Sequence, residues 1–527
     1  MFWGVLLAVL VSLLVQYTIK VVFLLRATSK SPGWIAFLPP AALTSVILPG
    51  HPRLNWNRAI GWKMKHDMYT RYNSTVLVVP NLLAPRTTVF VGDAEAIRRI
   101  NTDHRHFAKT AGVNNFVLNA WGANILTTDG APWRRHRKVI APSFTEANNE
   151  VVWRETVRST RLWFEQVDAG VDDQGKSIVK NVEEDMATMT LMVISKAAFG
   201  YELDWPAKKG ESAEMNFPEA ARIVLDHLLA VHVLPSWTYL LPIKKLRRIK
   251  AGKEFFEAQV RKLIDDRRAD LGSGRHDLLA SLLEANDQES GHASLSNDEL
   301  LSDVFIFLFA GHETSSNTLA ATLVLLALYP ESQERLYQEA ASVFGKDDSI
   351  TTSWDSFNSL PFTYAVLQEG LRLAGPVGFT TKMAIQNTSL PALTRDGEKI
   401  QVHVPKGATI RENVSAVHYS PHLWGDPFKF DPDRFLKKNN SKDDPDGWLP
   451  FSSGLRGCIG RNFAIAESVC FLAMTLLRYK VEIPEHRKEE WKLKEGETER
   501  ERRERILKPR WIVTLAPHDL DVTFVRR

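Results

Sequence analysis

Cysteine is almost absent from this sequence, which has two, Cys458 and Cys470, in 527 residues. So few thiols exclude a disulfide framework and indicate a reducing compartment for the folded part. Gly/Ser-rich linkers, repeats and low-complexity tracts are also missing, which favours one large domain behind an N-terminal appendage. Excess charge is missing too, since 66 basic residues accompany 62 acidic ones. This balance gives no reason to expect a nucleic-acid partner.

Acidic residues are missing from the first 66 positions. Phe2 to Leu25 is apolar with Lys20 as its only charged side chain, and this is about the length that spans a bilayer. The basic residues before Asp67 are Lys20, Arg26, Lys30, Arg53, Arg58, Lys63 and Lys65. Such asymmetry places the following domain on the cytoplasmic side. We therefore expect a single-pass signal anchor over 1–26, a basic, proline-containing membrane-proximal segment over 27–66, and a large domain over 67–527.

A cleaved secretory signal is the alternative for the N-terminus, since Ala27-Thr28-Ser29 could form a small-residue cleavage site. No basic region precedes the apolar run, which favours the anchor. A second apolar stretch, Trp34 to Leu48, is interrupted by Pro39-Pro40. We expect it to lie at the membrane interface rather than to span the bilayer.

Helical patterns dominate the rest of the chain, with a few short strands. The β-branched runs Thr75–Val79 and Thr87–Val91 predict a small sheet, and Asp93 predicts the cap of a helix. Residues 150–290 are mostly helical by periodicity and show no catalytic constellation. Residues 399–410 predict two short strands around a Pro-Lys-Gly turn, and residues 507–527 predict further strands. The expected class is mainly α with small β-sheets (α+β).

One cysteine is isolated in a loop of small residues, Phe451–Gly460, with the sequence FSSGLRGCIG. Its three glycines let the backbone turn tightly and approach a flat object. A thiolate held there can ligate iron, and Arg456 with nearby N–H groups would favour the ionised form. The next run, Arg461–Glu467, predicts a helix that would direct its positive dipole end at the sulfur. The alternative is a buried structural thiol, the usual state of a lone cysteine.

A long apolar helix is predicted between Ser296 and Tyr329. The Ser296–Glu299 capping box opens it and Pro330 follows it. Some thirty residues that are apolar nearly all round must cross the domain core. Its centre, Phe309–Asn317, clusters Gly, Thr and Ser, which are expected to loosen the hydrogen-bond ladder and leave room for a small ligand.

Two charged pairs lie on other predicted helices. Trp133 and Arg137 share one helix face at i and i+4, where both can meet a carboxylate; a surface basic helix with a packed tryptophan is the alternative. Glu369 and Arg372, at i and i+3, can pair in a bidentate manner. Usually such a pair is solvated and contributes only a few tenths of a kcal/mol.

Together these motifs resemble the cytochrome P-450 (heme-thiolate) family, of the microsomal eukaryotic type and with a fungal style of sequence. The pattern F-x-x-G-x-R-x-C-x-G matches the family's heme-ligating loop at every defined position. The resemblance implies the cytochrome P-450 fold and heme b with Cys458 as the axial thiolate. It also implies that Phe451, Gly454, Arg456 and Gly460 contribute to cofactor binding.

The resemblance implies roles for residues in other segments. Trp133, Arg137 and Arg456 would neutralise the heme propionates. Lys382 stands where many relatives carry a propionate-binding arginine, so its role stays open. Arg434, in the later Asp431–Phe435 motif, would complete a structural triad with Glu369 and Arg372.

The long helix matches the family's oxygen-binding helix. The resemblance implies that Thr314 hydrogen-bonds dioxygen or its water and that Glu313 relays protons. Proton supply is needed because O–O heterolysis requires a protonated leaving oxygen. The alternative is a core helix with back-bonded hydroxyls and an ion-paired glutamate.

The implied activity is insertion of one oxygen atom into a C–H or C=C bond of a lipophilic small molecule, in secondary metabolism such as terpenoid biosynthesis. The heme-thiolate catalytic domain would be cytosolic, at the endoplasmic reticulum membrane. No G-x-G-x-x-G fingerprint appears, so NADPH-cytochrome P-450 reductase is the expected electron donor, with cytochrome b5 as a further candidate. A basic docking patch for an acidic partner is predicted at Arg134, Arg135, Lys138, Lys437 and Lys438.

Two other functions stay open. One is a heme-thiolate isomerase or dehydratase that needs no dioxygen, against which the intact Thr314 argues. The other is a non-catalytic heme-binding protein, for which a retained proton-relay helix would need explanation.

Overall fold

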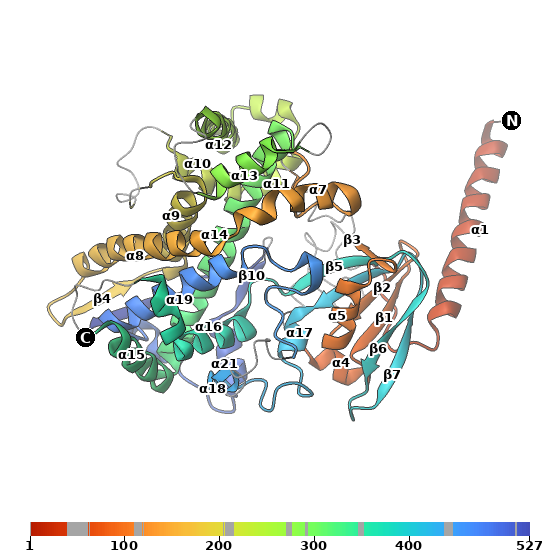
Figure 1. Ribbon diagram of the computed structural model, residues 1–527. Helices are drawn as coiled ribbons and strands as arrows, with labels where there is room; N and C mark the ends of the chain where they lie inside the picture. The colour runs from red at the N-terminus through yellow and green to blue at the C-terminus, as the bar shows by residue number, and fades with distance from the viewer. Residues whose placement is uncertain are drawn as a thin grey trace. The chain divides into compact units, whose positions relative to one another are not determined.

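The computed structural model describes residues 2–38, 62, 64–109, 118–119, 121–203, 205, 215–269, 277–289, 294–345, 353–436, 446–511 and 514–527. The predicted interfacial segment beyond Leu38, and Lys437 and Lys438 of the predicted docking patch, lie outside these residues. The chain forms two compact units, shown in Figure 1. The first unit comprises Met1–Val113, Val377–Phe428 and Asp443–Gly457, and the second comprises Asn114–Pro376, Lys429–Lys442 and Cys458–Arg527.

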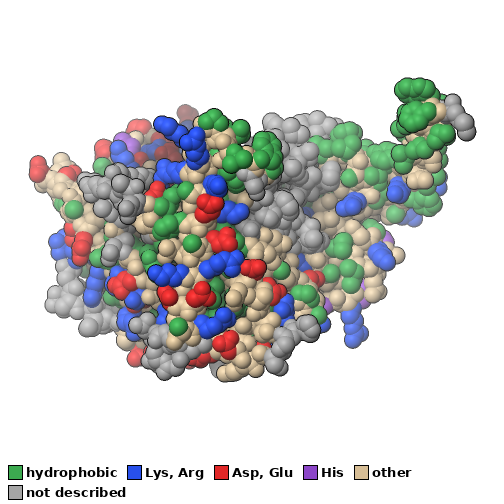
Figure 2. Space-filling view, turned by 90° about the horizontal axis from the view of Figure 1, so that it is seen from above, with side chains coloured by type: hydrophobic (Ala, Val, Ile, Leu, Met, Phe, Trp, Pro, Cys, Tyr) green, Lys and Arg blue, Asp and Glu red, His purple; other side chains and the backbone are tan. Residues whose placement is uncertain are grey.

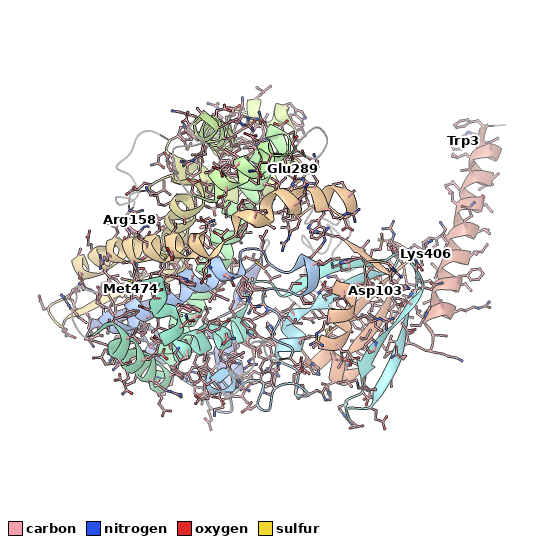
Figure 3. The ribbon with its side chains drawn as sticks, in the orientation of Figure 1. Trp3, Asp103, Arg158, Glu289, Lys406 and Met474 are labelled. Carbon is pink, nitrogen blue, oxygen red and sulfur yellow. The ribbon has the colours of Figure 1, made fainter. Side chains whose placement is uncertain are left out.

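The first unit begins with α1 (Phe2–Thr28), which ends two residues after the predicted anchor. Among the described residues it is the one helix long and apolar enough to cross a membrane. Its hydrophobic side chains are mostly exposed, as Figure 2 shows, and Trp3 near its start, labelled in Figure 3, is 79% exposed. Exposed apolar side chains on such a helix are compatible with a membrane anchor.

A five-stranded sheet of order β1-β2-β8-β5-β3 forms the body of the first unit. Its strands are β1 (Val76–Asn81), β2 (Arg86–Val91), β3 (Phe107–Lys109), β5 (Phe379–Ala384) and β8 (Thr409–Asn413). β1 and β2 form the strands that their β-branched runs predicted; they pair antiparallel and are buried on both faces except at Arg86. The unit also contains the short helices α4 (Asp67–Arg71) and α17 (Val414–His418).

Helix α5 (Ala94–Thr102) begins as predicted, because the side chain of Asp93 accepts a hydrogen bond from the N–H of Ala96 at 2.9 Å. The two strands predicted around the Pro-Lys-Gly turn also form, but they belong to different sheets. β7 (Lys399–Val404) pairs with β6 (Thr388–Leu393), whereas β8 joins the five-stranded sheet. The turn therefore connects two sheets rather than closing a hairpin.

The second unit is mainly helical (Figure 1). Its helices are α7 (Gly130–Ile140), α8 (Glu146–Ala169), α9 (Val182–Phe199), α10 (Phe217–Asp226), α11 (Leu228–Val233), α12 (Lys244–Ala269), α13 (Leu278–Asp287), α14 (Asn297–Leu328), α15 (Pro330–Phe344), α16 (Pro361–Ala374), α18 (Asp433–Leu436), α19 (Arg461–Arg478), α20 (Lys488–Trp491) and α21 (Glu499–Ile506). Its strands are β4 (Lys176–Val179), β9 (Tyr479–Glu482), β10 (Pro509–Trp511), β11 (Leu515–Pro517) and β12 (Val522–Arg526). The predicted class, mainly α with small sheets, is confirmed.

Helix α14 is the central element of the second unit and packs against α9, α16 and α19. The predicted capping box is present: the N–H of Ser296 donates to Glu299 Oε2 at 2.9 Å, and Ser296 Oγ accepts from the N–H of Glu299. The helix ends at Leu328, before Pro330, as predicted. Between Leu300 and Leu326 it is buried except at one central turn, Ala310–Thr314, whose residues are partly exposed.

Candidate functional site

The two cysteines have opposite environments. Cys458 is exposed and lies three residues before the start of α19, after the turn η5 (Gly454–Arg456). Cys470 lies within α19, is fully buried, and places its sulfur 4.0 Å from that of Met474, which Figure 3 labels. The structural-thiol alternative therefore describes Cys470, and Cys458 is the thiol that a ligand can reach.

Opposing influences act on the Cys458 thiol. It lies deep in the protein although its side chain keeps accessible surface, and burial raises its pKa. The N–H of Gly460 and the charges of Arg461 and Arg137 act in the other direction. These groups favour negative charge on the sulfur, which is what an iron ligand requires.

The glycine-rich loop depends on glycine at Gly454. Its φ is +69°, and a Cβ there would lie 2.7 Å from the carbonyl oxygen of Asn101 in α5. The Asn101 amide also donates to Ser453 Oγ at 3.2 Å, which holds the loop against the end of α5. By contrast, a Cβ at Gly460 would have no neighbour closer than 3.9 Å. Gly454 is therefore required by the loop itself, and Gly460 is not.

The remaining predicted loop residues are placed as follows. Phe451 is partly buried and packs edge-on against Trp448, with ring centroids 5.8 Å apart. Arg456 is partly buried at the end of η5. Trp133 and Arg137 are partly buried on one face of α7, and Arg137 is close enough to Cys458 for its charge to act on the thiol.

The basic docking patch predicted on this helix, α7, is wrong for Arg135. Its guanidinium forms an ion pair with Glu299 and donates to the carbonyl oxygen of Ser294 at 2.8 Å. Lys138 is exposed but pairs with Glu289 at 2.6 Å. Acidic side chains before and at the start of α14 thus neutralise two of the three cations that the patch has on α7. The third, Arg134, is exposed.

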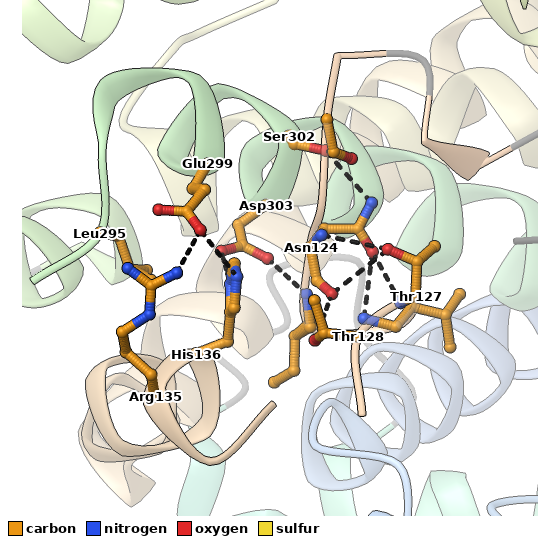
Figure 4. Close-up of polar contacts among 12 residues, drawn as sticks. Asn124, Thr127, Thr128, Arg135, His136, Leu295, Glu299, Ser302 and Asp303 are labelled. Atoms are coloured by element: carbon orange, nitrogen blue, oxygen red, sulfur yellow. Dashed lines mark hydrogen bonds and ion pairs between the residues drawn. The ribbon is translucent and has the colours of Figure 1, made fainter. Parts of the chain in front are cut away.

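A buried polar network joins α7 to α14 (Figure 4). His136 and Asp303 are fully buried, and His136 Nδ1 lies 2.7 Å from Asp303 Oδ2. Asp303 Oδ1 accepts from the N–H of Ile125 at 2.8 Å, and the Asn124 amide donates to Ser302 Oγ at 3.2 Å. This network fixes the position of α7 and with it the face that carries Trp133 and Arg137. The sequence signal was an aspartate inside an otherwise apolar helix.

The predicted loosening of the ladder at the centre of α14 is wrong, because the helix runs through it without a break. Thr314 instead donates to the carbonyl oxygen of Ala310 at 2.6 Å, the back-bonding expected of a helical threonine. Gly311 lets α9 approach, since a Cβ there would lie 2.3 Å from Ile194 Cδ1. The accessible surface at Ala310–Thr314 therefore does not come from a broken helix.

Glu313 forms no ion pair with any residue in the described part of the chain. Its Oε1 accepts a hydrogen bond from Thr514 Oγ1 at 2.6 Å, and its Oε2 is buried and unpartnered among the described residues. Burial, with a smaller contribution from Asp226, raises the pKa of Glu313 to about 7. An acid with this pKa exchanges protons near neutral pH, so the alternative of an ion-paired glutamate does not hold.

Glu369, Arg372 and Arg434 are brought together. Arg372 Nε lies 2.6 Å from Glu369 Oε2, and Arg434 Nε lies 3.2 Å from Oε1. Glu369 and Arg372 are fully buried, so this is not the solvated pair that helix spacing alone suggests. The N–H of Asp431 also donates to Glu369 at 2.8 Å, which ties the later loop to α16.

Lys382 lies buried on β5, close enough to Glu412 on β8 for its charge to lower the pKa of that carboxyl, which burial raises. Thr380 also donates to Glu412. Lys382 therefore has a carboxylate neighbour within its own sheet.

Sequence reasoning missed two residues near the central turn of α14. One is Thr514, described above. The other is Glu467 on α19, whose carboxylate oxygens are buried near the Ser315 hydroxyl of α14, which lowers its pKa less than burial raises it. Burial raises its pKa to about 8. Only its place in a strongly apolar helix marked Glu467 in the sequence, and nothing marked Thr514.

The described residues fit a heme on three observations. Cys458 presents an exposed thiol at the start of a helix. Helix α14 has an accessible central turn, Ala310–Thr314, between two buried stretches. A cation, Arg137, lies close enough to the thiol for its charge to favour the ionised form. Heme is a flat, iron-containing group with two negatively charged propionates. It matches a thiolate, an accessible helix turn and a nearby cation.

Comparisons with known proteins agree with this geometry. The family model for cytochrome P450 matches residues 53–502. Cytochrome P450 monooxygenase 124 of Postia placenta is 35% identical over 474 residues, covering 88% of each chain. Secologanin synthase 1 of Catharanthus roseus is 28% identical over 411 residues, covering 75% of this chain and 74% of its own. The crystal structure of the cytochrome P450DA heme domain matches in fold, with a TM-score of 0.72 at 22% identity over 94% of this chain and 97% of that one.

Proposed function

The chain belongs to the cytochrome P450 family, whose members are heme-thiolate monooxygenases, and we propose that it oxygenates a lipophilic secondary metabolite, such as a terpenoid, at the endoplasmic reticulum membrane. The observation that carries this proposal is the exposed thiol of Cys458 at the start of α19. The overall reaction joins one oxygen atom to the substrate and releases the other as water. It consumes dioxygen, two electrons and two protons.

Heme held by Cys458 supplies the reductive activation of dioxygen. The chain's own residues hold the group and supply protons. Trp133, Arg137 and Arg456 would bind the propionates through N–H donors and positive charge. Lys382 is a further candidate, with the Glu412 carboxyl close by in its own sheet.

Proton supply is the proposed role of Glu313 and Thr314. Glu313 holds an exchangeable proton near neutral pH, and Thr314 on the next position offers a hydroxyl. Because that hydroxyl donates its proton to the carbonyl oxygen of Ala310, its oxygen remains available to accept a hydrogen bond from a water, and it would donate to dioxygen by turning away from Ala310. Such a pair can deliver protons to a ligand bound at the accessible turn. The buried remainder of the helix excludes bulk water.

Electrons would come from NADPH through a separate reductase, with cytochrome b5 as a second candidate donor. The membrane-anchored state is supported by α1 and by the exposed apolar residues Trp237, Leu240 and Ile243 around the turn η2 (Ser236–Leu240). Lys244 and Lys245 follow directly, a pattern suited to an anionic lipid surface. An enzyme held at a membrane meets substrates dissolved in it, which supports a lipophilic substrate.

The two cysteines provide a matched test. The absorption spectrum of the dithionite-reduced protein under carbon monoxide should show a Soret band shifted far to the red, as thiolate ligation produces. Cys458→Ala should abolish the shift, and Cys470→Ala should retain it. A histidine-type band in the wild type, or a shift that survives Cys458→Ala, would contradict the proposal.

Turnover tests the two open alternatives. Product formed without NADPH and dioxygen would support the isomerase or dehydratase. A complete lack of substrate-induced spectral change across terpenoids, sterols and fatty acids would favour a non-catalytic heme-binding protein.

A further inference from the structure

A hydrogen-bonded chain connects α14 to the segment before β11. Thr514 Oγ1 donates to Glu313 Oε1 at 2.6 Å, and the Asn317 amide donates to Thr514 Oγ1 at 3.3 Å. Asn317 lies one turn after Glu313 on α14, so both ends of the chain belong to one helix. Thr514 and Asn317 are each 6% exposed, which keeps water from competing for these bonds.

The donors define the direction of this chain. The Asn317 amide occupies one lone pair of the Thr514 oxygen, and the hydroxyl proton of Thr514 then points to Glu313 Oε1. Because Oε1 already accepts a proton from Thr514, the acidic proton of Glu313 is placed on the other oxygen, Oε2. That oxygen is the one with no partner among the described residues.

Resting on the role of Glu313 proposed above, we propose that Thr514 is a positioning residue, which keeps the transferable proton of Glu313 on Oε2 and is itself oriented by Asn317. Without the Thr514 hydroxyl, the carboxyl group could rotate and place its proton on either oxygen. In half of the orientations of the Glu313 carboxyl group, the oxygen at the Oε2 position would then carry a lone pair instead of the transferable proton. The expected consequence is slower proton delivery. A larger share of the reduced oxygen would then leave as hydrogen peroxide, without product.

Charges around Glu313 agree with this assignment. Burial and the Asp226 carboxylate of α10 raise the pKa of Glu313, and the Thr514 hydrogen bond lowers it. The neighbouring His312 has a pKa lowered by burial to about 4 and is therefore neutral at physiological pH. Thr514 is thus the group that favours the ionised carboxyl, and its removal should make Glu313 a weaker acid.

The primary test titrates Glu313 in the resting ferric protein, without substrate or NADPH. Infrared difference spectra recorded against pH, with Glu313→Gln to assign the carboxyl band, should show the midpoint near pH 7 in the wild type. Thr514→Val should move the midpoint up by about one pH unit, because a hydrogen bond to a charged group is lost. Thr514→Ser should restore the wild-type midpoint, and an unchanged midpoint in Thr514→Val would overturn the proposal.

Thr322→Val is the matched control, since Thr322 also lies on α14 but donates to the carbonyl oxygen of Thr318. Its midpoint should equal that of the wild type. If Thr514→Val does not fold, Asn317→Ala tests the same chain: it should shift the midpoint in the same direction by a smaller amount, and no shift would overturn the proposal.

Coupling separates this proposal from the one on which it rests. The fraction of NADPH that ends in hydrogen peroxide should rise in Glu313→Gln and in Thr514→Val, but not in Thr514→Ser. A rise in Glu313→Gln alone would overturn the role of Thr514 and leave that of Glu313. No rise in Glu313→Gln would overturn the role of Glu313 itself, whatever the infrared titration shows.

Discussion

Two glutamates of the same unit, the fully buried Glu369 and the largely buried Glu313, have their negative charge compensated in different ways. Glu369 is fully buried and meets two arginines and a backbone N–H. Glu313 meets one neutral hydroxyl, and its second oxygen has no partner among the described residues. The first carboxylate is held by charge, and the second can be neutralised only by a proton. Burial alone therefore does not decide a glutamate's role, and the surrounding charges do.

The physical reason is the cost of placing charge away from water. A buried ion pair recovers that cost only when the geometry and the remaining hydrogen bonds are good, as they are for Glu369 and Arg372. Where no cation is near, the carboxyl group raises its pKa and stays neutral. Glu313 and Glu467 both follow this second course.

Glu369→Ala should have the largest effect on stability. It leaves two guanidiniums without their shared carboxylate, one of them fully buried, and should lower the free energy of unfolding by roughly 3–5 kcal/mol. Urea denaturation followed by tryptophan fluorescence measures this. Glu334→Gln, which removes an exposed partner of Arg527, is the control and should change stability by less than about 0.5 kcal/mol. A loss below about 1 kcal/mol for Glu369→Ala would mean that the triad does not hold the fold.

Glu467→Gln should raise the free energy of unfolding, whereas Glu369→Ala lowers it. The folded state keeps this acid protonated up to about pH 8, while the unfolded state ionises near pH 4.5. The wild type therefore loses stability as pH rises from about 4.5 to 8, by up to roughly 4 kcal/mol at one pKa unit per 1.4 kcal/mol. The variant should lack this loss, so its advantage should grow up to pH 8. An advantage that does not change with pH would contradict the raised pKa.

Glu313→Gln should behave similarly over a narrower range. Its pKa of about 7 in the folded state means that wild-type stability falls between about pH 4.5 and pH 7, by up to roughly 3 kcal/mol, and is flat above. Between pH 7 and 8, only Glu467→Gln should continue to gain on the wild type. Paired urea titrations at pH 5, 6, 7 and 8 distinguish the two acids, and identical profiles would show that the two sites are not separate.

Arg434→Gln should have the smallest effect. Arg434 is 13% exposed and is the outer of the two arginines, so Glu369 keeps Arg372 and the Asp431 N–H when it is lost. We expect a loss of roughly 1–2 kcal/mol, the usual value for one hydrogen bond to a charged group. A loss as large as that of Glu369→Ala would mean that the outer arginine contributes as much to stability as the buried one.

Sequence patterns located the local features of the site well. The capping box at Ser296, the helix cap at Asp93 and the loop around Cys458 each depend on neighbours within a few residues. Arg135 shows the limit of such patterns. Helix periodicity put it on an outer basic face, and its partner Glu299 lies 164 positions away in the chain. The predicted loosening of α14 also failed: the Thr314 hydroxyl bonds within its own helix, and the helix is continuous.

By itself, the sequence determined the apolar N-terminal helix, the long central helix, the thiol available to iron and the mainly helical class. These features follow from composition and from spacing over one or two turns. Only the tertiary structure decided which buried carboxyl groups have a cation beside them. It placed Thr514 beside Glu313 across 201 positions, put the Glu369 triad out of solvent, and left Glu467 without a cation. A carboxyl group's proton affinity depends on the charges and water within a few ångströms of it, and those are set by packing between distant segments.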